Sequence, residues 1–325
     1  MIYGEVEGVN KPVARVIQGT TMIGSDLNEM ESFSLFDQVY ELGCNTLDTA
    51  HVYAGGNSER ILGRWMQARG LREKMVIITK GGAHSEDRRR MTSFDVTADL
   101  FDSLARLKTN YIDLYLLHRD DTNLPVDPIL HTLNEHLQAG RIRAFGASNW
   151  SHQRMQKAAE YTKANGLKTF AASSPQYSLA DSNAEPWPLC LSISGDSGKE
   201  AREWHASTNT PAMVWSPLAS GFFSGKFRRD NLHTFDEREW DEVVVRTYAT
   251  EANFQRLERA ESLAKKKGVT AAQIALAYVM NQSMNVFSVV GSHSSEKFKA
   301  NIDAAKLKLT SQELAWLDLK VEQPS

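Results

Sequence analysis

Residues 75–79 read Met-Val-Ile-Ile-Thr, and Lys80 follows them directly. An apolar run of this length, rich in β-branched residues, predicts a strand buried on both faces, as strands are in parallel sheets. Residues 111–117, Tyr-Ile-Asp-Leu-Tyr-Leu-Leu, form a second such run, and His118 follows it. Between the two runs, residues 94–107 carry apolar side chains at helical spacing. This order of strand, helix and strand predicts a parallel βαβ unit.

The same alternation extends in both directions along the chain. Strands are expected at residues 13–18, 45–48, 75–79, 111–117, 144–147, 170–174, 212–216 and 286–290. Helices with an apolar face are expected at residues 29–42, 58–67, 94–107, 128–139, 151–164, 251–267, 270–281 and 294–304. Such alternation without a break in composition predicts an α/β fold, a single (β/α)8 or TIM barrel domain over residues 1–325. Its active site would lie at the carboxyl ends of the strands.

An open, doubly wound sheet is the alternative fold. That fold usually carries a G-x-G-x-x-G turn after its first strand, and the sequence contains no such motif. Residues 221–227, Gly-Phe-Phe-Ser-Gly-Lys-Phe, resemble a phosphate-binding P-loop but are one residue short. Phe227 also stands where that loop needs Ser or Thr to hold magnesium. We therefore favour the barrel.

The composition is that of a globular protein. The chain has 325 residues, of which 42% are hydrophobic and 24% charged, and a net charge of −3. This charge argues against binding to nucleic acid or to an anionic membrane. No apolar run reaches the roughly 18 residues of a membrane-spanning helix. The N-terminal sequence resembles no secretion signal, and two cysteines are too few for a disulfide framework, so we expect a cytoplasmic protein.

Residues 45–59, Asn-Thr-Leu-Asp-Thr-Ala-His-Val-Tyr-Ala-Gly-Gly-Asn-Ser-Glu, place polar side chains between a strand and a helix. Asp48 ends the strand and Tyr53 lies on the loop. Asn57 or Ser58 is expected to cap the helix. Taken alone, the carboxylate and the phenol could simply anchor the loop by a hydrogen bond.

Lys80 and His118 change this interpretation, because they stand at the ends of the next two strands. In a barrel these ends face one mouth, so four polar side chains from three adjacent strands would converge. A neighbouring Lys80 ammonium, held by Asp48, would favour ionisation of the Tyr53 phenol, whose ordinary pKa is about 10. Tyr53 could then exchange a proton with a carbonyl oxygen that accepts a hydrogen bond from His118.

The sequence resembles the aldo-keto reductase family over about residues 13–305. The matching stretches are LDTAHVYAGGNSERILG, IITKGG, IDLYLLHRDD, GRIRAFGASNW, SPQYSL, WSPLASGFFSGK and VVGSHSSEKFKANI. The resemblance implies hydride transfer from a nicotinamide cofactor to an aldehyde or ketone. It implies that Tyr53 is the proton donor, that Lys80 and Asp48 together adjust the pKa of Tyr53, and that His118 orients the substrate. The last two stretches look closest to the bacterial and channel-β-subunit branches.

The resemblance also implies a cofactor site along the later strands. Trp215 would stack on the nicotinamide ring, as a flat aromatic side chain can. The carboxamide of the nicotinamide would contact Ser148, Asn149 and Gln176. The pyrophosphate would lie against Ser216, Leu218, Ser220, Gly221 and Lys226. The adenosine end would contact Gly291, Ser292, Ser294, Lys297 and Asn301.

The last of these segments opens a predicted helix, whose N-terminus favours an anion. Ser292, Ser294 and Lys297 match family positions around the adenosine 2′-phosphate, so NADP(H) is expected rather than NAD. Two departures bear on this expectation. Gly291 replaces a lysine found in some members, and Ala300 replaces an acidic residue.

Aromatic side chains near the mouth are candidates for contact with a carbonyl substrate. We expect Trp150 and Trp187 to touch it, and Trp204 to pack in a helix. The identity of the substrate depends on loops whose conformation the sequence does not predict. These loops lie near residues 84–91, 119–127, 180–198 and 222–250.

Other charged or metal-binding patterns are weaker. Residues 88–90, Arg-Arg-Arg, are expected to be an exposed loop run. No metal site is expected, because His131 and His136 would point about 140° apart around their helix.

Two other functional classes stay open. A lysine at the end of a barrel strand can form a Schiff base, as in an aldolase or lyase. Asp48 and the cofactor-like carboxyl-terminal segments argue against that class, which needs neither. A regulatory module that binds nucleotide and has only incidental reductase activity would keep the same four residues. The sequence does not predict an oligomeric state.

Overall fold

Eight parallel strands close into a barrel, as the sequence predicts. The computed structural model describes residues 1–235 and 239–323. Each strand pairs with the next along the chain, and the last pairs with the first. The barrel strands are β3 (Val16–Gly19), β4 (Thr46–Asp48), β5 (Val76–Gly81), β6 (Ile112–Leu117), β7 (Ile142–Ser148), β8 (Ala172–Ser174), β9 (Ala212–Trp215) and β10 (Val286–Val290).

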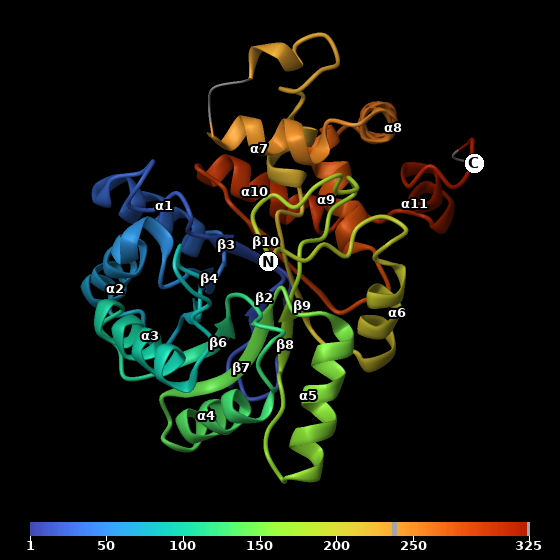
Figure 1. Ribbon diagram of the computed structural model, residues 1–325. Helices are drawn as coiled ribbons and strands as arrows, with labels where there is room; N and C mark the ends of the chain where they lie inside the picture. The colour runs from blue at the N-terminus through green and yellow to red at the C-terminus, as the bar shows by residue number, and fades with distance from the viewer. Residues whose placement is uncertain (236–238, 324–325) are drawn as a thin grey trace.

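Helices surround the strands (Figure 1). They are α1 (Glu29–Glu41), α2 (Asn57–Arg69), α3 (Ser93–Arg106), α4 (Asp127–Gln138), α5 (His152–Ala164), α6 (Lys199–Thr208), α7 (Glu239–Tyr248), α8 (Glu251–Lys267), α9 (Ala271–Met280), α10 (Ser295–Ala304) and α11 (Ser311–Leu317). Three short 3-10 turns lie in loops: η1 (Tyr53–Gly56), η2 (Ala219–Ser224) and η3 (Leu232–Thr234). Helices α7 and α11 were not predicted. Among the described residues, no helix is both long and apolar enough to cross a membrane.

The strand predicted at residues 13–18 is in fact two strands. Val13–Ala14 forms β2, which pairs antiparallel with β1 (Tyr3–Gly4), and the barrel strand β3 begins at Val16. The reason is packing. Val6 and Val13 belong to the same buried cluster as the inward-facing barrel residue Ile17, so the hairpin adds its own side chains to the barrel interior.

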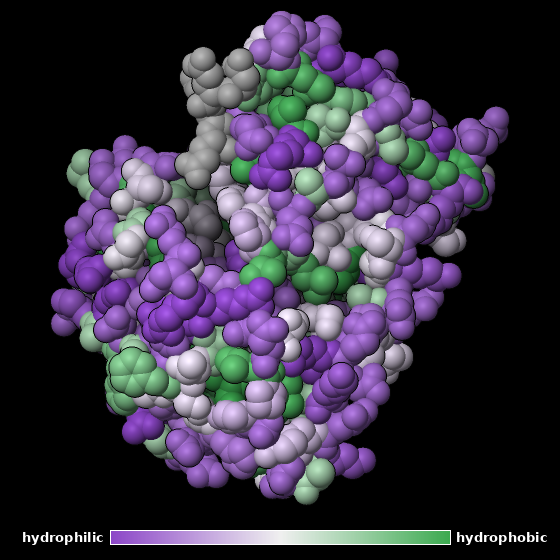
Figure 2. Space-filling view, viewed as in Figure 1, coloured by the Kyte–Doolittle hydropathy of each residue, from purple (hydrophilic) through white to green (hydrophobic). Residues whose placement is uncertain are grey.

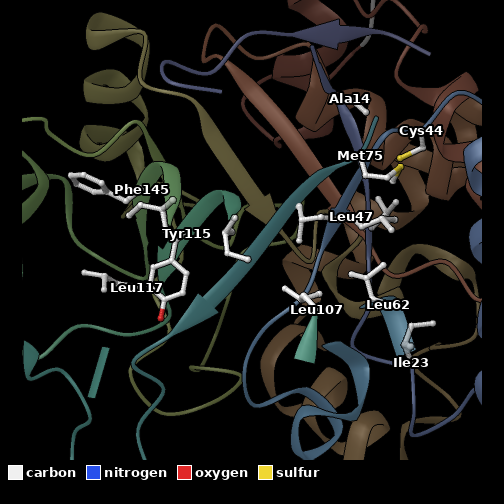
Figure 3. Close-up of a cluster of buried hydrophobic side chains, with 14 of the residues drawn as sticks. Ala14, Ile23, Cys44, Leu47, Leu62, Met75, Leu107, Tyr115, Leu117 and Phe145 are labelled. Carbon is white, nitrogen blue, oxygen red and sulfur yellow. The ribbon is translucent and has the colours of Figure 1, made fainter. Parts of the chain in front are cut away.

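Two further apolar clusters lie between the strands and the helices. Figure 3 shows part of the first of them: Tyr115 and Phe145 lie together on the left of the view, and Leu47, Leu62 and Leu107 lie on the right. The outer face in Figure 2 is mainly hydrophilic, with separate apolar patches. Burial on both sides explains why the strand sequences are continuous apolar runs and do not alternate.

Helix α2 begins differently from the prediction. Its N-cap is Gly56, in a left-handed conformation (φ 85°) and without a side-chain cap. Asn57 instead donates to the Gly24 carbonyl oxygen over 3.4 Å, and the buried Ser58 hydroxyl donates to the Thr20 carbonyl oxygen over 3.0 Å. Both predicted caps are thus used to tie the start of α2 to the loop that follows β3. This contact fixes the turn that carries the active-site loop of β4.

Candidate active site

The buried ammonium of Lys80 is the centre of the site. Its Nζ donates to Asp48 Oδ1 over 2.6 Å, to the Thr49 carbonyl oxygen over 2.8 Å and to the Tyr53 hydroxyl over 3.3 Å. Strand pairing produces this contact, because Asp48 lies opposite Ile78 in the parallel register of β4 and β5. Lys80 lies two residues further along β5, and its long side chain reaches back to the end of β4.

His118 joins the group from the end of β6. Its backbone N–H donates to the Gly81 carbonyl oxygen over 2.8 Å, which fixes the residue beside the end of β5. Its ring lies edge-on to the Tyr53 ring, with centroids 5.8 Å apart and planes at 78°. The structure therefore brings the four predicted side chains, Asp48, Tyr53, Lys80 and His118, to one mouth of the barrel.

Burial controls the ionisation of Tyr53 and Lys80. It raises the pKa of the Tyr53 phenol above its ordinary value, although the Lys80 ammonium acts in the opposite direction. The expected effect of Lys80, which favours the phenolate, is therefore present, but burial outweighs it and the pKa of Tyr53 is raised overall. Burial also disfavours the charge on Lys80, but the Asp48 carboxylate and the interactions with Asp48 and Tyr53 outweigh that effect and raise the Lys80 pKa. At neutral pH the site holds a protonated phenol beside an ammonium.

His118 is a neutral imidazole at neutral pH. Burial lowers its pKa well below the ordinary value, and the charges of Lys80 and Arg119 act in the same direction. Its Nδ1 is buried and has no hydrogen-bond partner among the described residues. A neutral imidazole can donate one hydrogen bond without adding a charge to the site.

The side chains predicted to hold the nicotinamide carboxamide are used by the protein itself. Gln176 is 0% exposed, and its amide bonds with the hydroxyls of four serines, at positions 178, 182, 192 and 194. Asn149 accepts from the Leu191 backbone N–H over 3.0 Å and donates to Ser148 and to the His118 carbonyl oxygen. Gln176 Nε2 donates one bond within this group, to Ser178, and the predicted contact of Gln176 with the carboxamide stays a prediction. Asn149 and Ser148 shape the wall between β7 and the segment at residue 191.

Tryptophans gather on one side of the mouth. The Trp187 ring lies 6.2 Å from that of Trp215 and 5.5 Å from that of Trp240. Trp240, on α7, was not singled out in the sequence, because an exposed aromatic residue on a helix gives no signal of its own. The Trp215 indole Nε1 is buried and has no hydrogen-bond partner among the described residues.

The substrate contact predicted for Trp150 is wrong for this structure. Its side chain is 2% exposed, packs edge-on against Phe170 and is covered by the Arg154 guanidinium, 4.7 Å from the ring. Its indole N–H donates to the Arg119 carbonyl oxygen over 3.0 Å. Trp150 therefore supports the backbone behind the mouth and does not line it. Trp204, on α6, contacts neighbouring histidine rings and the core, as predicted.

The turn after β9, which was predicted to lie against the pyrophosphate, has a left-handed backbone at several residues. Ser216, Ala219, Ser220 and Gly221 all have positive φ, between 48° and 96°. A Cβ added to Gly221 would meet nothing within 4 Å, so a ligand could approach this backbone closely. Two N–H groups of the turn are already used within it, because Ala219 N–H donates to the Ser216 carbonyl oxygen over 2.9 Å and Gly221 N–H to the Leu218 carbonyl oxygen over 3.0 Å. Leu218 belongs to the same turn, which fits a pyrophosphate.

Lys226 is not a free cation in this structure, because its Nζ lies 2.7 Å from both carboxylate oxygens of Asp241. At the start of α10, the Ser294 hydroxyl caps the helix, and the buried Ser292 hydroxyl accepts from Asn301 over 3.1 Å. Lys297 is exposed and forms no salt bridge with a described residue. The residues at this end thus suit a phosphate, with Lys297 and the helix N-terminus as its ligands. Gly291, just before them, is exposed.

Comparison with known proteins agrees with this geometry. The Aldo/keto reductase family model matches residues 15–322. The chain is 28% identical over 318 residues to norsolorinic acid reductase of Emericella nidulans, covering 91% of this chain and 73% of that protein. It is also 28% identical to the uncharacterized oxidoreductase YrpG of Bacillus subtilis, covering 94% and 91% of the two chains.

Among solved structures, the glycerol dehydrogenase of Gluconobacter oxydans superposes with a TM-score of 0.75 at 23% identity. This match covers 97% of this chain and 94% of that one. At this identity the likeness concerns the fold alone. The family match spans nearly the whole chain, and the residues that meet at the barrel mouth come from within it. This chain is therefore a member of the aldo/keto reductase family of oxidoreductases.

Proposed function

We propose that this oxidoreductase uses NADP(H) to reduce an aldehyde or ketone, with Tyr53 as the proton donor. The observation that carries the proposal is the contact of the buried Lys80 ammonium with both Asp48 and the Tyr53 hydroxyl. When bound, the nicotinamide supplies the hydride. The residues of the chain supply everything else: a proton, a donor to the carbonyl oxygen and a site that excludes water.

Tyr53 can give its proton at the moment when negative charge develops on the carbonyl oxygen. Its raised pKa keeps the phenol protonated before the reaction, and the nearby Lys80 ammonium stabilises the phenolate that proton transfer leaves behind. The neutral His118 imidazole can donate a hydrogen bond to the same oxygen and so orient the substrate. Asp48 holds the Lys80 ammonium in place.

The cofactor residues follow from the geometry of the later strands. Trp215 would stack on the nicotinamide, and the turn at 216–221 would hold the pyrophosphate. Lys297, Ser294 and the N-terminus of α10 would hold the 2′-phosphate. Asn301, bonded to Ser292, would lie beside the adenine. Trp187, next to Trp215, would contact the substrate.

A Schiff-base aldolase is disfavoured by the ionisation of Lys80. Imine formation needs a neutral amine, and enzymes of that kind lower the lysine pKa. Here the contact with Asp48 and Tyr53 raises it. A regulatory module that binds nucleotide without useful turnover is the second alternative, and measurement of turnover separates it from an enzyme.

We predict that Tyr53→Phe lowers the rate of aldehyde reduction by about 10²–10⁴-fold, because the general acid is lost while the ring and its packing are kept. NADPH binding should survive, since the proposed cofactor residues lie on β7 to β10. The measurement pairs NADPH fluorescence titration with aldehyde-dependent NADPH oxidation on one preparation.

Tyr111→Phe is the matched control, because the Tyr111 hydroxyl bonds to Glu73 before β6 begins. Wild-type turnover by Tyr53→Phe would refute the role of Tyr53. Tight NADPH binding without turnover by the wild type would favour the regulatory module.

The pH dependence of aldehyde reduction follows from the direction of two pKa shifts. The donor must be protonated, and burial raises the Tyr53 pKa above its ordinary value of about 10. His118 must be neutral, and its pKa lies well below its ordinary value. We therefore expect kcat to be constant between about pH 7 and 9 and to fall only above about 10. A fall of kcat with an apparent pKa near 7 would contradict these assignments. A stopped-flow pH profile of the hydride-transfer step measures this.

NADPH should bind more tightly than NADH, by about ten- to a hundredfold, which is the value of a charged hydrogen bond to the 2′-phosphate. Lys297→Ala should remove most of this preference. Lys299→Ala is the control, because Lys299 lies on the same helix but pairs with Asp303 at 2.6 Å. Fluorescence titration of both nucleotides against the three proteins measures the ratio. Equal affinity of the wild type for the two nucleotides would remove the 2′-phosphate site.

A further inference from the structure

Most cationic side chains around the barrel mouth already have a carboxylate partner. Arg89 lies 3.1 Å from Asp121. Lys226 pairs with Asp241, as described above, and Arg88 and Arg90 pair with the buried Asp95 and Asp99. The three arginines at 88–90, expected to be an exposed run, are thus bound one by one to acidic residues. Their charges are neutralised where they lie.

Arg119 differs from these side chains. It directly follows His118 and is only partly buried, and its guanidinium forms no salt bridge with any side chain in 1–235 or 240–323. The hydrogen bond that it makes is from Nη1 to the His118 carbonyl oxygen, over 3.0 Å. This bond folds the guanidinium back over the end of β6, beside the His118 ring. One Nη1–H bond leaves most of the five N–H donors of the group free for other acceptors.

The backbone beneath Arg119 is rigidly held. The Trp150 indole N–H donates to its carbonyl oxygen, and the Arg154 guanidinium that covers Trp150 also bonds to Asp120 over 2.8 Å. The charge of Arg119 reaches the reacting groups, since it lowers the pKa of His118 and of His84. The guanidinium, which has no carboxylate partner among the described side chains, thus lies close enough to His118 for its charge to act on the imidazole.

The position of Arg119 assigns it to the substrate and not to the cofactor. The proposed cofactor residues lie at the ends of β7 to β10, whereas Arg119 lies at the end of β6, next to His118. An anion that meets Arg119 must therefore belong to the molecule that also brings its carbonyl to Tyr53 and His118. A guanidinium binds a carboxylate with two parallel N–H bonds, which gives both affinity and orientation.

We propose that Arg119 is a specificity-determining residue that selects carbonyl substrates carrying a carboxylate in the same molecule. This inference rests on the proposed reductase function and names a substrate class for it. The competing explanation is structural: Arg119 holds only the His118 carbonyl, and its loss would lower the turnover of every substrate alike. A ratio of two substrates, measured within each variant, separates the two explanations.

The experiment compares 4-carboxybenzaldehyde with 4-formylbenzamide, which have nearly the same shape but differ by one negative charge at pH 7. For the wild type we expect kcat/KM to favour the carboxylate by about ten- to a hundredfold, which is the value of a charged hydrogen bond. In Arg119→Met this ratio should fall close to one, whatever happens to the absolute rates. Arg119→Lys should keep part of it, because the charge stays but the paired geometry is lost.

Arg143→Met is the matched control, because Arg143 lies at the start of β7, over the ring of Tyr111. It should keep the wild-type ratio. A wild-type ratio near one, or an unchanged ratio in Arg119→Met, overturns the inference while leaving the reductase function standing.

If the wild type binds NADPH but reduces neither aldehyde, the reductase function fails. Binding of the two corresponding benzyl alcohols to the NADP⁺ complex, followed by tryptophan fluorescence, then decides the inference. Tighter binding of the carboxylate that is lost in Arg119→Met supports it, and equal binding of the two alcohols overturns it.

Discussion

The ion pair between Lys80 and Asp48 is the interaction on which the site depends. Both side chains are buried, and their atoms lie 2.6 Å apart. Taking two charges out of water is costly, and the cost is offset only when geometry and further hydrogen bonds are good. The Thr49 carbonyl and the Tyr53 hydroxyl supply those bonds. Loss of either partner would leave a buried charge unpaired, so the pair holds Tyr53 and the loop after β4 in one arrangement.

The closed barrel makes that ion pair possible. The register of β4 against β5 and of β5 against β6 places three strand ends side by side. The hairpin at the N-terminus adds side chains to the barrel interior, and Ser58 and Asn57 tie the helix after the Tyr53 turn to the loop after β3. The contacts of Ser58 and Asn57 serve rigidity at the mouth, where small displacements of a proton donor lower the rate steeply, whereas the hairpin lies at the opposite end of the barrel.

The sequence predicts those features that depend on short-range pattern. Apolar runs such as 75–79 identify strands, and a polar residue just beyond such a run identifies a mouth position, which is how Lys80 and His118 could be found. Features that depend on distant partners could not be predicted. Gln176 is enclosed by serines from a later loop, and Trp150 is covered by Arg154 from the following helix. Asn57 and Ser58 have good capping chemistry but bond instead to carbonyl oxygens of another loop.

The ion pairs around the mouth also depend on distant partners and could not be predicted. Nothing in the run 88–90 indicates that each arginine meets its own carboxylate, because the partners lie on α3 and beyond β6. Once these pairs are known, Arg119 stands out as a cation that has no carboxylate partner among the described side chains. The side of the mouth formed by β4 to β6 thus carries the residues of the proposed proton transfer and a cation without a carboxylate partner among the described side chains, while β7 to β10 carry the residues proposed to hold the nucleotide.

The central claim is that this site transfers a hydride to a carbonyl carbon. Its most direct test uses NADPH that carries deuterium at the transferred position of C4, with an aldehyde as the substrate. Mass spectrometry and NMR of the product give the position of the label. The account predicts one deuterium on the alcohol carbon for each NADPH oxidised. An alcohol without deuterium, or an aldehyde-lysine adduct trapped by borohydride, would contradict it.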